Sequence, residues 1–334
     1  MKTLRDTYGR VHDYLRISVT DKCNLHCVYC NPAQTQNLHS FNAALLTIQE
    51  IFTIISMGVE QYGITKIRLT GGEPLIRKDI DELFVLLREL KSRIPFSLGI
   101  TTNGILLKDK IGFLAEHGLN SINISVDSLR RMSYNRITQH DTFDTVLAAV
   151  NAVKQSSIPS LKINCVVMRG INDREIIDFV HFAIQNNLNV RFIEYMPFTN
   201  NGWSDDLFIS YGEMKKNIES QFHLIPLATN SHAVAKDYLI EGHPGTISFI
   251  TSVSEHFCAG CNRIRIAANG TVKPCLFSIP DQEIHLTPLL RSEHGSVDDI
   301  YKNIQTSLLK KWEQHPDTAE LSRMKNNQML SIGG

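Results

Sequence analysis

The chain has 334 residues, of which 43% are hydrophobic and 20% charged, close to the values of an ordinary soluble globular protein. This composition excludes a disordered or fibrous chain. The 34 basic residues balance the 34 acidic ones, so neither a nucleic-acid-binding coat nor an acidic tail is expected. The first 20 residues contain no apolar signal segment and no stretch is apolar enough to span a membrane. We therefore expect a cytoplasmic protein that binds neither nucleic acid nor a membrane.

Six strand-like segments alternate with helix-like segments over about the first 200 residues. The strands are expected at residues 14–20, 66–70, 96–102, 121–127, 161–168 and 190–195. Apolar residues at i, i+3, i+4 and i+7 mark helices over 80–90 and 143–153, and Asn172 with Glu175 predicts a capping box before another helix. This alternation is typical of βαβ units and a parallel sheet. Beyond Trp203 the rhythm is lost, so we expect a barrel part, residues 1–230, and a C-terminal region, residues 231–334.

The predicted strands alternate strictly between apolar and polar residues. Ile122 and Ile124, for example, interleave with Asn123 and Ser125. Parallel strands covered by helices on both faces are normally apolar throughout, so here one face packs on helices and the other is polar. An antiparallel sheet with one wet face would give the same pattern, but the intervening helices favour a parallel sheet curled around a polar lumen. Six units are too few to close a barrel. The fold class expected is α/β, an incomplete (βα)6-type parallel barrel.

Basic residues occupy the polar face of several predicted strands. Arg16, Arg68 and Lys162 point to the lumen, and Arg191 on the last strand joins them. Cations gathered in a concave site need an anionic partner, and phosphate suits the forked guanidinium group. The alternative is that each cation pairs with a carboxylate such as Asp127. For the set as a whole we favour an anion pocket.

Seven cysteines are an odd number, and a chain of this length needs no disulfide framework. Three of them, Cys23, Cys27 and Cys30, form a C-x3-C-x2-C loop directly after the first strand. A structural zinc site would want four ligands, whereas three thiolates on a [4Fe–4S] cluster leave one iron open. This loop, with Tyr29 before its last cysteine and the later segment Gly71-Gly72-Glu73-Pro74, resembles the radical S-adenosylmethionine (SAM) superfamily.

That resemblance implies how the first cysteine group is used. The cluster would bind the amino and carboxylate groups of SAM, and one electron would cleave SAM to a 5′-deoxyadenosyl radical. The SAM-binding residues implied are Tyr29, Gly72, Ser125 and Met196. Taken alone, Ser125 and Met196 would be interpreted as ordinary lining and core residues.

A second group of three cysteines is Cys258, Cys261 and Cys275. A zinc ribbon completed by His256 is one interpretation. A second [4Fe–4S] cluster with its own open iron is the other. Arg263 and Arg265 follow at alternate positions, so they share one face if this stretch is a strand.

Within the superfamily the chain resembles the GTP 3′,8-cyclases of molybdenum cofactor biosynthesis, essentially from end to end. The segments that carry this resemblance are residues 9–10, 13–23, 68–75, 101–104, 168–173, 191–196, 261–265, 273–277 and 333–334. It implies two [4Fe–4S] clusters, with guanine bound at the C-terminal one. The GTP-binding residues implied are Arg16, Arg68, Thr101, Lys162, Arg263, Ile264 and Arg265. Catalytic roles are implied for Arg263, Arg265 and the terminal Gly333 and Gly334.

The chemistry implied is removal of the ribose 3′-hydrogen, attack of the ribose radical on guanine C8, and reduction to 3′,8-cyclo-7,8-dihydro-GTP. The product would pass to cyclic pyranopterin monophosphate synthase, and we expect a monomer or a homodimer. Two alternatives stay open: a radical SAM enzyme that modifies a peptide with an auxiliary cluster, and a zinc-ribbon binding protein. The seventh cysteine, Cys165, lies on the apolar phase of its strand and is expected in the core.

Overall fold

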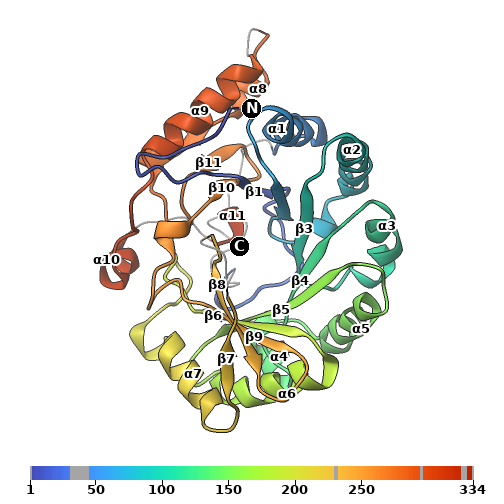
Figure 1. Cartoon of the computed structure of the whole chain (residues 1–334), viewed down its shortest axis with the longest axis vertical. Coiled ribbons are helices and arrows are strands. Elements are labelled where there is room, and N and C mark those ends of the chain that lie inside the picture. Colours follow the sequence, from blue (N-terminus) through green and yellow to red (C-terminus); the bar gives the residue numbers. More distant parts are fainter. Residues whose placement is uncertain (1, 31–44, 229–231, 294–295, 325–328, 333–334) are drawn as a thin grey trace.

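In the part of the chain that the structure describes, twelve strands form one sheet, with helices arranged around its outside (Figure 1). The computed structural model describes residues 2–30, 45–228, 232–293, 296–324 and 329–332. The strands are β1 (Tyr14–Ser18), β2 (Lys66–Thr70), β3 (Ser97–Thr102), β4 (Ser121–Ser125), β5 (Ser160–Val167), β6 (Asn189–Glu194), β7 (Leu224–Pro226), β8 (Ala235–Ile240), β9 (Thr246–Ile250), β10 (Arg263–Ile266), β11 (Thr271–Lys273) and β12 (Ile284–His285). The helices are α1 (Ile48–Gln61), α2 (Ile80–Arg93), α3 (Ile111–Glu116), α4 (Arg131–Thr138), α5 (Phe143–Lys154), α6 (Ile176–Asn186), α7 (Tyr211–Glu219), α8 (Thr287–Leu290), α9 (Val297–Leu309), α10 (Thr318–Arg323) and α11 (Met329–Ile332).

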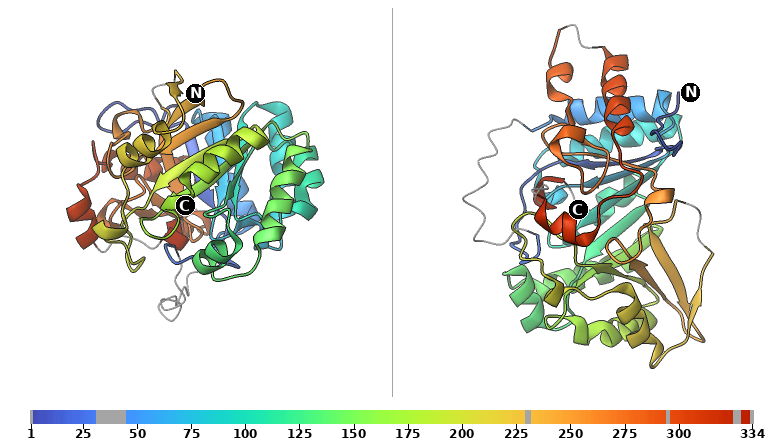
Figure 2. Two further views of the ribbon diagram at one scale, coloured as in Figure 1. Left: turned by 90° about the horizontal axis from the view of Figure 1, so that it is seen from below. Right: turned by 90° about the vertical axis from the view of Figure 1, so that its left-hand side faces the viewer.

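The order of the strands is β12-β11-β10-β1-β2-β3-β4-β5-β6-β9-β8-β7. Strands β1 to β6 are parallel in chain order, which confirms the six predicted βα units and the incomplete barrel. Two later strands extend the parallel part, β10 beside β1 and β9 beside β6. Within the described residues this order is linear, so the sheet curls without closing on itself (Figures 1 and 2). The division at residue 230 stays a prediction.

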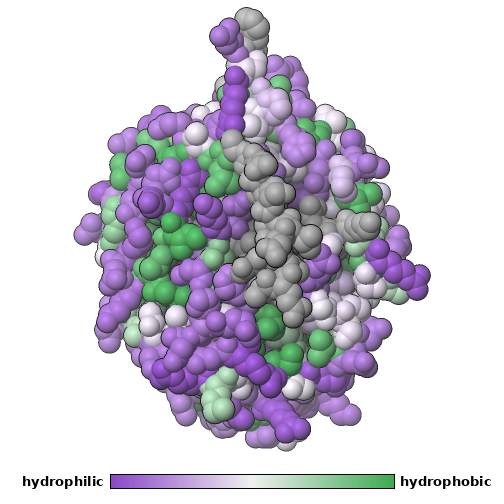
Figure 3. All heavy atoms as spheres, turned by 180° about the vertical axis from the view of Figure 1, so that it is seen from behind, coloured by the Kyte–Doolittle hydropathy of each residue, from purple (hydrophilic) through white to green (hydrophobic). Residues whose placement is uncertain are grey.

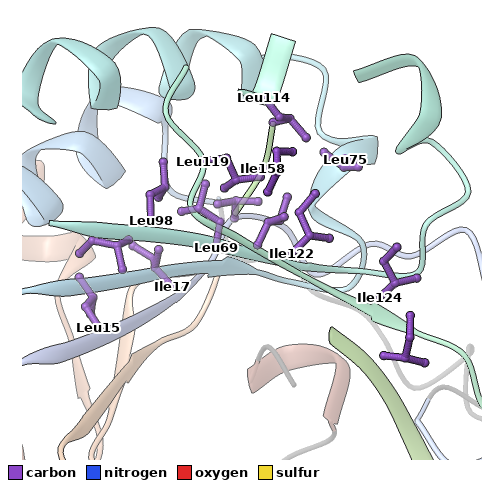
Figure 4. Close-up of a cluster of buried hydrophobic side chains, with 14 of the residues drawn as sticks. Leu15, Ile17, Leu69, Leu75, Leu98, Leu114, Leu119, Ile122, Ile124 and Ile158 are labelled. Carbon is purple, nitrogen blue, oxygen red and sulfur yellow. The ribbon is translucent and has the colours of Figure 1, made fainter. Parts of the chain in front are cut away.

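The core lies between the sheet and its helices. Apolar residues from alternate positions of the strands, such as Ile17, Leu69 and Ile122, are buried there and face the surrounding helices (Figure 4). Each such side chain contributes about 1.5–3 kcal/mol through the hydrophobic effect. Cys165 belongs to this core, as predicted. The polar residues of the same strands are thereby left on the inner face.

Local sequence signals explain some of the helix boundaries. Helix α1 begins with a capping box, in which Thr47 and Glu50 bond to each other's backbone N–H groups. The capping box predicted at Asn172 is wrong. The side chain of Asn172 accepts from the N–H of Met168 and donates to the carbonyl of Asp127. It is occupied by buried backbone groups of the neighbouring loops. A 3-10 turn, Asp173–Glu175, follows Asn172 directly and leads into helix α6 at Ile176.

The face opposite to the view of Figure 1 is mainly hydrophilic, and hydrophobic residues form separate patches on it (Figure 3). In the described part of the chain, every helix is too short or too polar to cross a lipid bilayer.

Candidate active site

One cavity of about 830 Å³ occupies the inside of the curled sheet. All six cysteines of the two predicted groups line it. Nine cationic side chains of the described residues line the same cavity, against three carboxylates: Arg10, Arg16, Lys66, Arg68, Lys162, Arg191, Arg263, Arg265 and Lys311, against Asp13, Asp127 and Asp237. A chain with a net charge of zero therefore concentrates positive charge in its lumen, as expected for a site that takes a small polyanion.

The two cysteine groups lie at opposite ends of this barrel. The loop with Cys23, Cys27 and Cys30 follows β1, so it lies at the carboxyl end of the parallel strands. Strand β10 is parallel to β1 and begins two residues after Cys261, while β11 runs antiparallel to β10 and ends two residues before Cys275. The second group therefore lies at the amino end of the strands. The cavity extends between them.

At the carboxyl end, the two glycines after β2 pack directly against the cysteine loop. A Cβ atom on Gly72 would lie 2.1 Å from the carbonyl oxygen of Lys22, and one on Gly71 would lie 2.6 Å from that of Thr20. The N–H groups of Gly72 and Glu73 donate to the carbonyls of Thr20 and Lys22, both at 2.8 Å. Glycine is needed here because no side chain fits between the strand end and the loop.

The carboxylate of Glu73 fixes this end of the barrel further. It is buried and accepts hydrogen bonds from the N–H of Leu75, from Thr102 Oγ1 (2.7 Å) and from the N–H of Asn103 (2.7 Å). Burial raises the pKa of Glu73 to about 7, although these bonds oppose the shift. Asn103 in turn donates to Asn24, between the first two cysteines. Glu73 thus joins the ends of β2 and β3 to the cysteine loop.

Tyr29 is held by a second buried carboxylate. Its hydroxyl donates to Asp127 Oδ2 at 2.8 Å, and Asp127 Oδ1 accepts from the N–H of Val166. Burial raises the pKa of Asp127 to about 6. The other two residues predicted to bind SAM, Ser125 and Met196, line the cavity. Gly72 lines it as well.

The thiols of the first group lie in an apolar and acidic setting. Burial raises the pKa of Cys23 to about 11, with Glu73 adding to the shift, and that of Cys30 to about 12. The pKa of Cys27 is also raised by burial, and Asp127 adds to it. Among the described residues, these three thiols have no fourth ligand beside them, a donor set that fits a [4Fe–4S] cluster with one open iron.

The second group lies in a cationic setting. Lys311 Nζ donates to Cys261 Sγ at 3.3 Å, and Arg263 Nη2 donates to the same sulfur at 3.6 Å. Burial raises the pKa of Cys261, but these two cations outweigh it and the pKa falls to about 5. Arg10 binds the loop from the other side, donating to the carbonyl of Cys258 at 2.7 Å. The three thiols again form a donor set that fits a [4Fe–4S] cluster.

The zinc-ribbon interpretation needs a fourth ligand close to the three cysteines. His256 instead contacts His315, with 3.0 Å between Nδ1 and Nε2. In the described ranges no three His, Cys, Asp or Glu side chains converge on a position suited to a single metal ion. A tetrahedral zinc site requires such convergence, whereas the thiolates around a four-iron cluster stand farther apart.

Between the two ends, three arginines lie side by side on neighbouring strands. Arg16 on β1 is directly opposite Arg265 on β10 and Arg68 on β2. The next position in this row is Gly99 on β3, where a Cβ atom would come within 2.7 Å of Arg68 Nη2. Like charges opposite each other destabilise a sheet unless an anion binds between them. This row is the strongest indication of a phosphate-binding site.

Among the described residues, three of these cations, Arg68, Lys162 and Arg191, do not pair with carboxylates as the alternative required. Asp127 binds Tyr29, and Arg68 donates to three acceptors that are not carboxylates, Tyr14 Oη, the carbonyl of Ile100 and Ser121 Oγ. In the part of the chain that the structure describes, neither Arg68, Lys162 nor Arg191 forms an ion pair.

Three polar atoms that line the cavity or its wall are buried without a hydrogen-bond partner in the described structure: Thr101 Oγ1, Asn164 Oδ1 and Arg191 Nε. Unsatisfied buried polar groups destabilise a fold, so their presence indicates a place for a ligand. Burial lowers the pKa of Lys162 to about 8, with the charge of Arg191 adding to the shift.

The structure therefore gathers most of the predicted site residues around one cavity. Ile264 is the exception: its side chain is buried in the core, so only its backbone could serve a ligand. Gly333 and Gly334 lie outside the described residues. Three further cavity residues, Lys66, Tyr14 and Lys311, were not predicted from the sequence. Tyr14 and Lys66 stand on predicted strands, at the positions two before Arg16 and Arg68, so the alternation could have found them.

Tyr14 is notable because cations surround it. Burial raises its pKa, but Arg16, Arg68 and Lys66 outweigh burial and lower the pKa to about 7. Lys66 also makes a cation–π contact with Tyr14, with its Nζ 4.6 Å from the centre of the tyrosine ring.

Comparisons with known proteins agree with this geometry. Residues 17–183 match the Radical SAM superfamily, and residues 188–317 match the family described as Molybdenum Cofactor Synthesis C. The mitochondrial GTP 3′,8-cyclase of Arabidopsis thaliana is 41% identical over 99% of this chain and 83% of its own length. The GTP 3′,8-cyclase of Petrotoga mobilis is 38% identical over 98% of this chain and 99% of its own.

The chain spans only about half, 51%, of the length of the human relative named molybdenum cofactor biosynthesis protein 1. Among solved structures, Streptococcus suis SuiB bound to S-adenosylmethionine is similar in fold, with a TM-score of 0.62 and 17% identity over 90% of this chain and 69% of that one. The family matches and the long alignments together assign the chain to the radical SAM superfamily and, within it, to the GTP 3′,8-cyclase family.

Proposed function

We propose that this protein converts GTP to 3′,8-cyclo-7,8-dihydro-GTP, as the first step of molybdenum cofactor biosynthesis. The observation that carries the proposal is the arginine row Arg265-Arg16-Arg68, set in one cavity between two groups of three cysteines. The names of the relatives point to the same activity. A peptide substrate would not require so cationic a lumen.

At the carboxyl end, Cys23, Cys27 and Cys30 would hold the first [4Fe–4S] cluster, and SAM would lie beside it. The chemistry that cluster and SAM supply when bound is a 5′-deoxyadenosyl radical. Gly72 would serve through its carbonyl oxygen, because its N–H is bonded to Thr20. Asp127 keeps Tyr29 against this site. Ser125 and Met196 would line the SAM pocket, and their packing limits the entry of water.

In the middle of the cavity, the cations would bind the triphosphate. Arg16, Arg68 and Lys162 supply positive charge from three strands, and Thr101 has a buried hydroxyl ready to donate. These groups stand on β-strands, so they are oriented before the nucleotide binds, which lowers the entropy lost on binding.

At the amino end, Cys258, Cys261 and Cys275 would hold a second [4Fe–4S] cluster that takes the guanine. Arg263 and Arg265 would orient the base and neutralise charge next to it. The ribose then lies between the two ends, within reach of the SAM site. We include Gly333 and Gly334 among the catalytic residues on the strength of the family resemblance.

The test is anaerobic incubation of the reduced protein with SAM, with and without GTP. We expect 5′-deoxyadenosine to form in a GTP-dependent way, together with a product that carries the ribose joined to the base, detected by mass spectrometry. ATP is the control nucleotide, because it offers the same triphosphate on a different base. If SAM cleavage were equal with GTP, with ATP and with neither, the substrate assignment would be wrong.

We further propose that the product passes to cyclic pyranopterin monophosphate synthase and that the protein is a monomer or a homodimer. Light scattering of the reconstituted protein would determine its mass. The cytoplasmic location stays a prediction.

A further inference from the structure

Lys311 is a buried lysine whose place in the cavity wall the proposed reaction does not explain. Its residue is only 4% exposed, and Nζ donates to Cys261 Sγ at 3.3 Å and to the carbonyl of Arg263 at 3.1 Å. In the described part of the chain no carboxylate pairs with it. A lysine is rarely buried without an anion. Among the described residues, the anion that Lys311 contacts is the thiolate of Cys261.

The surrounding fold holds Lys311 in place. It follows directly after helix α9, whose Ser307 donates to the carbonyl of Gln282, while the side chain of Gln282 donates to the carbonyl of Lys310. On the other side of the helix, Tyr301 donates to the carbonyl of Ile54. Helix α9 is thus tied to two separate parts of the chain, which fixes the backbone that carries Lys311 next to the second cysteine group.

Other groups nearby leave the charge of Lys311 uncancelled. The buried carboxylate of Asp6 is engaged by Arg10 Nε at 2.5 Å and by His12 Nε2 at 3.0 Å. Burial lowers the pKa of His12 to about 4, with the charge of Lys311 adding to the shift, so His12 is neutral near pH 7. Arg10 also bonds to the carbonyls of Cys258 and Trp312, which adds a second cation on this side.

We infer that Lys311 is a positioning residue that raises the reduction potential of the second cluster through its hydrogen bond to Cys261. This inference rests on the second cluster of the proposed function. Adding an electron makes a cluster more negative, and a cation bonded to one of its sulfur ligands stabilises that state. Hydrogen bonds to the sulfurs and local charge are known determinants of cluster potentials.

The first cysteine group offers the contrast within the same molecule. In the described structure, no lysine or arginine side chain donates to Cys23, Cys27 or Cys30; the donors to Cys23 Sγ are uncharged and include the N–H of Leu25 and the amide of Asn103. Its potential is therefore an internal reference that Lys311 does not influence.

The experiment compares the Lys311→Met, Lys311→Gln and Lys311→Arg variants of the full-length protein after anaerobic reconstitution, with iron and sulfide counted. Redox titration followed by electron paramagnetic resonance gives the potential of each cluster. Lys310→Met is the matched control, because Lys310 is the adjacent, exposed lysine and carries the same charge.

We expect Lys311→Met to lower the equilibrium constant for reduction of the second cluster at least tenfold, which is about 59 mV for one electron. Lys311→Gln keeps donors without the charge and should fall between Met and wild type. Lys311→Arg and Lys310→Met should stay near wild type, and the first cluster should not change in any variant.

An unchanged second potential in Lys311→Met, or an equal shift of both clusters, would overturn the inference. If Lys311→Met lost the second cluster altogether, Lys311→Gln would be the deciding variant. A potential of its second cluster below that of wild type would support the inference, and a potential equal to that of wild type would overturn it. If the wild-type protein bound only one cluster, the proposed second cluster would fall and this inference with it. If the wild type and the variants all held two clusters and the potential of the second cluster were the same in each protein, the proposed function would stand. Only the role of Lys311 would then be overturned.

Discussion

The two ends of the barrel present the same number of cysteines in opposite electrostatic settings. At the carboxyl end, Cys27 lies near Asp127 and its pKa is raised by burial and by that carboxylate. At the amino end, Cys261 lies against Arg263 and Lys311, and its pKa falls to about 5 although burial opposes the shift. The difference follows from the charged residues around the sulfurs.

This difference matches the charges of the two proposed ligands. SAM carries a positive sulfonium group, which the buried carboxylates of the carboxyl end tolerate. GTP carries several negative charges, which the cations of the middle and the amino end attract. The molecule thus separates two ligands of opposite charge along one cavity.

The largest effect is expected from removing one cysteine at either end. Cys27→Ala should reduce bound iron by half and abolish 5′-deoxyadenosine formation, because two thiolates do not retain the first cluster. Cys258→Ala should also halve the iron but leave the first cluster able to bind SAM. Cys165→Ala is the control, since this thiol is in the core, and it should keep both clusters. Equal loss of both clusters in Cys27→Ala or in Cys258→Ala would contradict the prediction that the two cysteine groups hold separate clusters.

The next effect is expected at the glycines that pack on the first cysteine loop. Gly72→Ala should displace this loop, since the new Cβ would lie 2.1 Å from the carbonyl of Lys22. We expect loss of most of the first cluster with the second retained, measured by iron content and electron paramagnetic resonance. Gly112→Ala is the matched control, because nothing lies within 4 Å of a Cβ atom there. A normal iron content in Gly72→Ala would contradict this prediction, because it would show that the cysteine loop can accommodate a side chain at this position.

A smaller effect is expected for GTP affinity when the arginines of the amino end are replaced. Arg263→Met and Arg265→Met should each weaken binding by about 1.5–3 kcal/mol, the value of a hydrogen bond to a charged group. This is roughly a 10- to 150-fold rise in Kd, measured by calorimetry with the first cluster intact. Arg88→Met, on the exposed face of α2, is the control. An unchanged Kd in both site variants would place the nucleotide elsewhere.

The smallest effect concerns pH. The pKa of Lys162 is lowered to about 8, so this side chain is charged below that pH and neutral above it. If one charge contact is worth about 1.4 kcal/mol, GTP affinity should fall roughly fivefold between about pH 7 and about pH 9. Lys162→Met should lack this fivefold component.

In the absence of GTP, the effect of pH on folding stability is opposite to its effect on GTP affinity. Lys162 is protonated in the unfolded chain up to its ordinary pKa of 10.5, whereas in the fold it loses its proton near pH 8. Its burial therefore destabilises the fold most below about pH 8 and progressively less toward pH 10.5.

For GTP binding, the outcome that would contradict the prediction is the same pH dependence of Kd in wild type and Lys162→Met. That result would remove Lys162 from the binding site.

The inner and outer faces of the barrel could be predicted because they are local. Alternation along β1, β2 and β4 placed Arg16 and Arg68 inside and Ile122 outside without knowledge of which strands pair. The first cysteine group was visible for the same reason, because Cys23, Cys27 and Cys30 are close in sequence, whereas Cys275 is farther along the chain from Cys258 and Cys261.

The long-range pairings could not be predicted. Strand β10 lies beside β1 although about 250 residues separate them, and this pairing alone completes the arginine row with Arg265. Lys311 gives no local signal either, since a lysine after an amphipathic helix is ordinarily exposed. Gly72 was predicted only as a SAM-binding residue, whereas in the fold its N–H is bonded to Thr20 and it packs closely against the cysteine loop.

The central claim is that the two ends of one cavity bind different ligands. The most direct test is electron paramagnetic resonance of two single-cluster proteins, Cys27→Ala with only the C-terminal cluster and Cys258→Ala with only the N-terminal one, each with SAM or with GTP. We predict that SAM changes only the signal of the N-terminal cluster and GTP only that of the C-terminal cluster. A GTP effect on the N-terminal cluster with none on the C-terminal cluster would contradict the account.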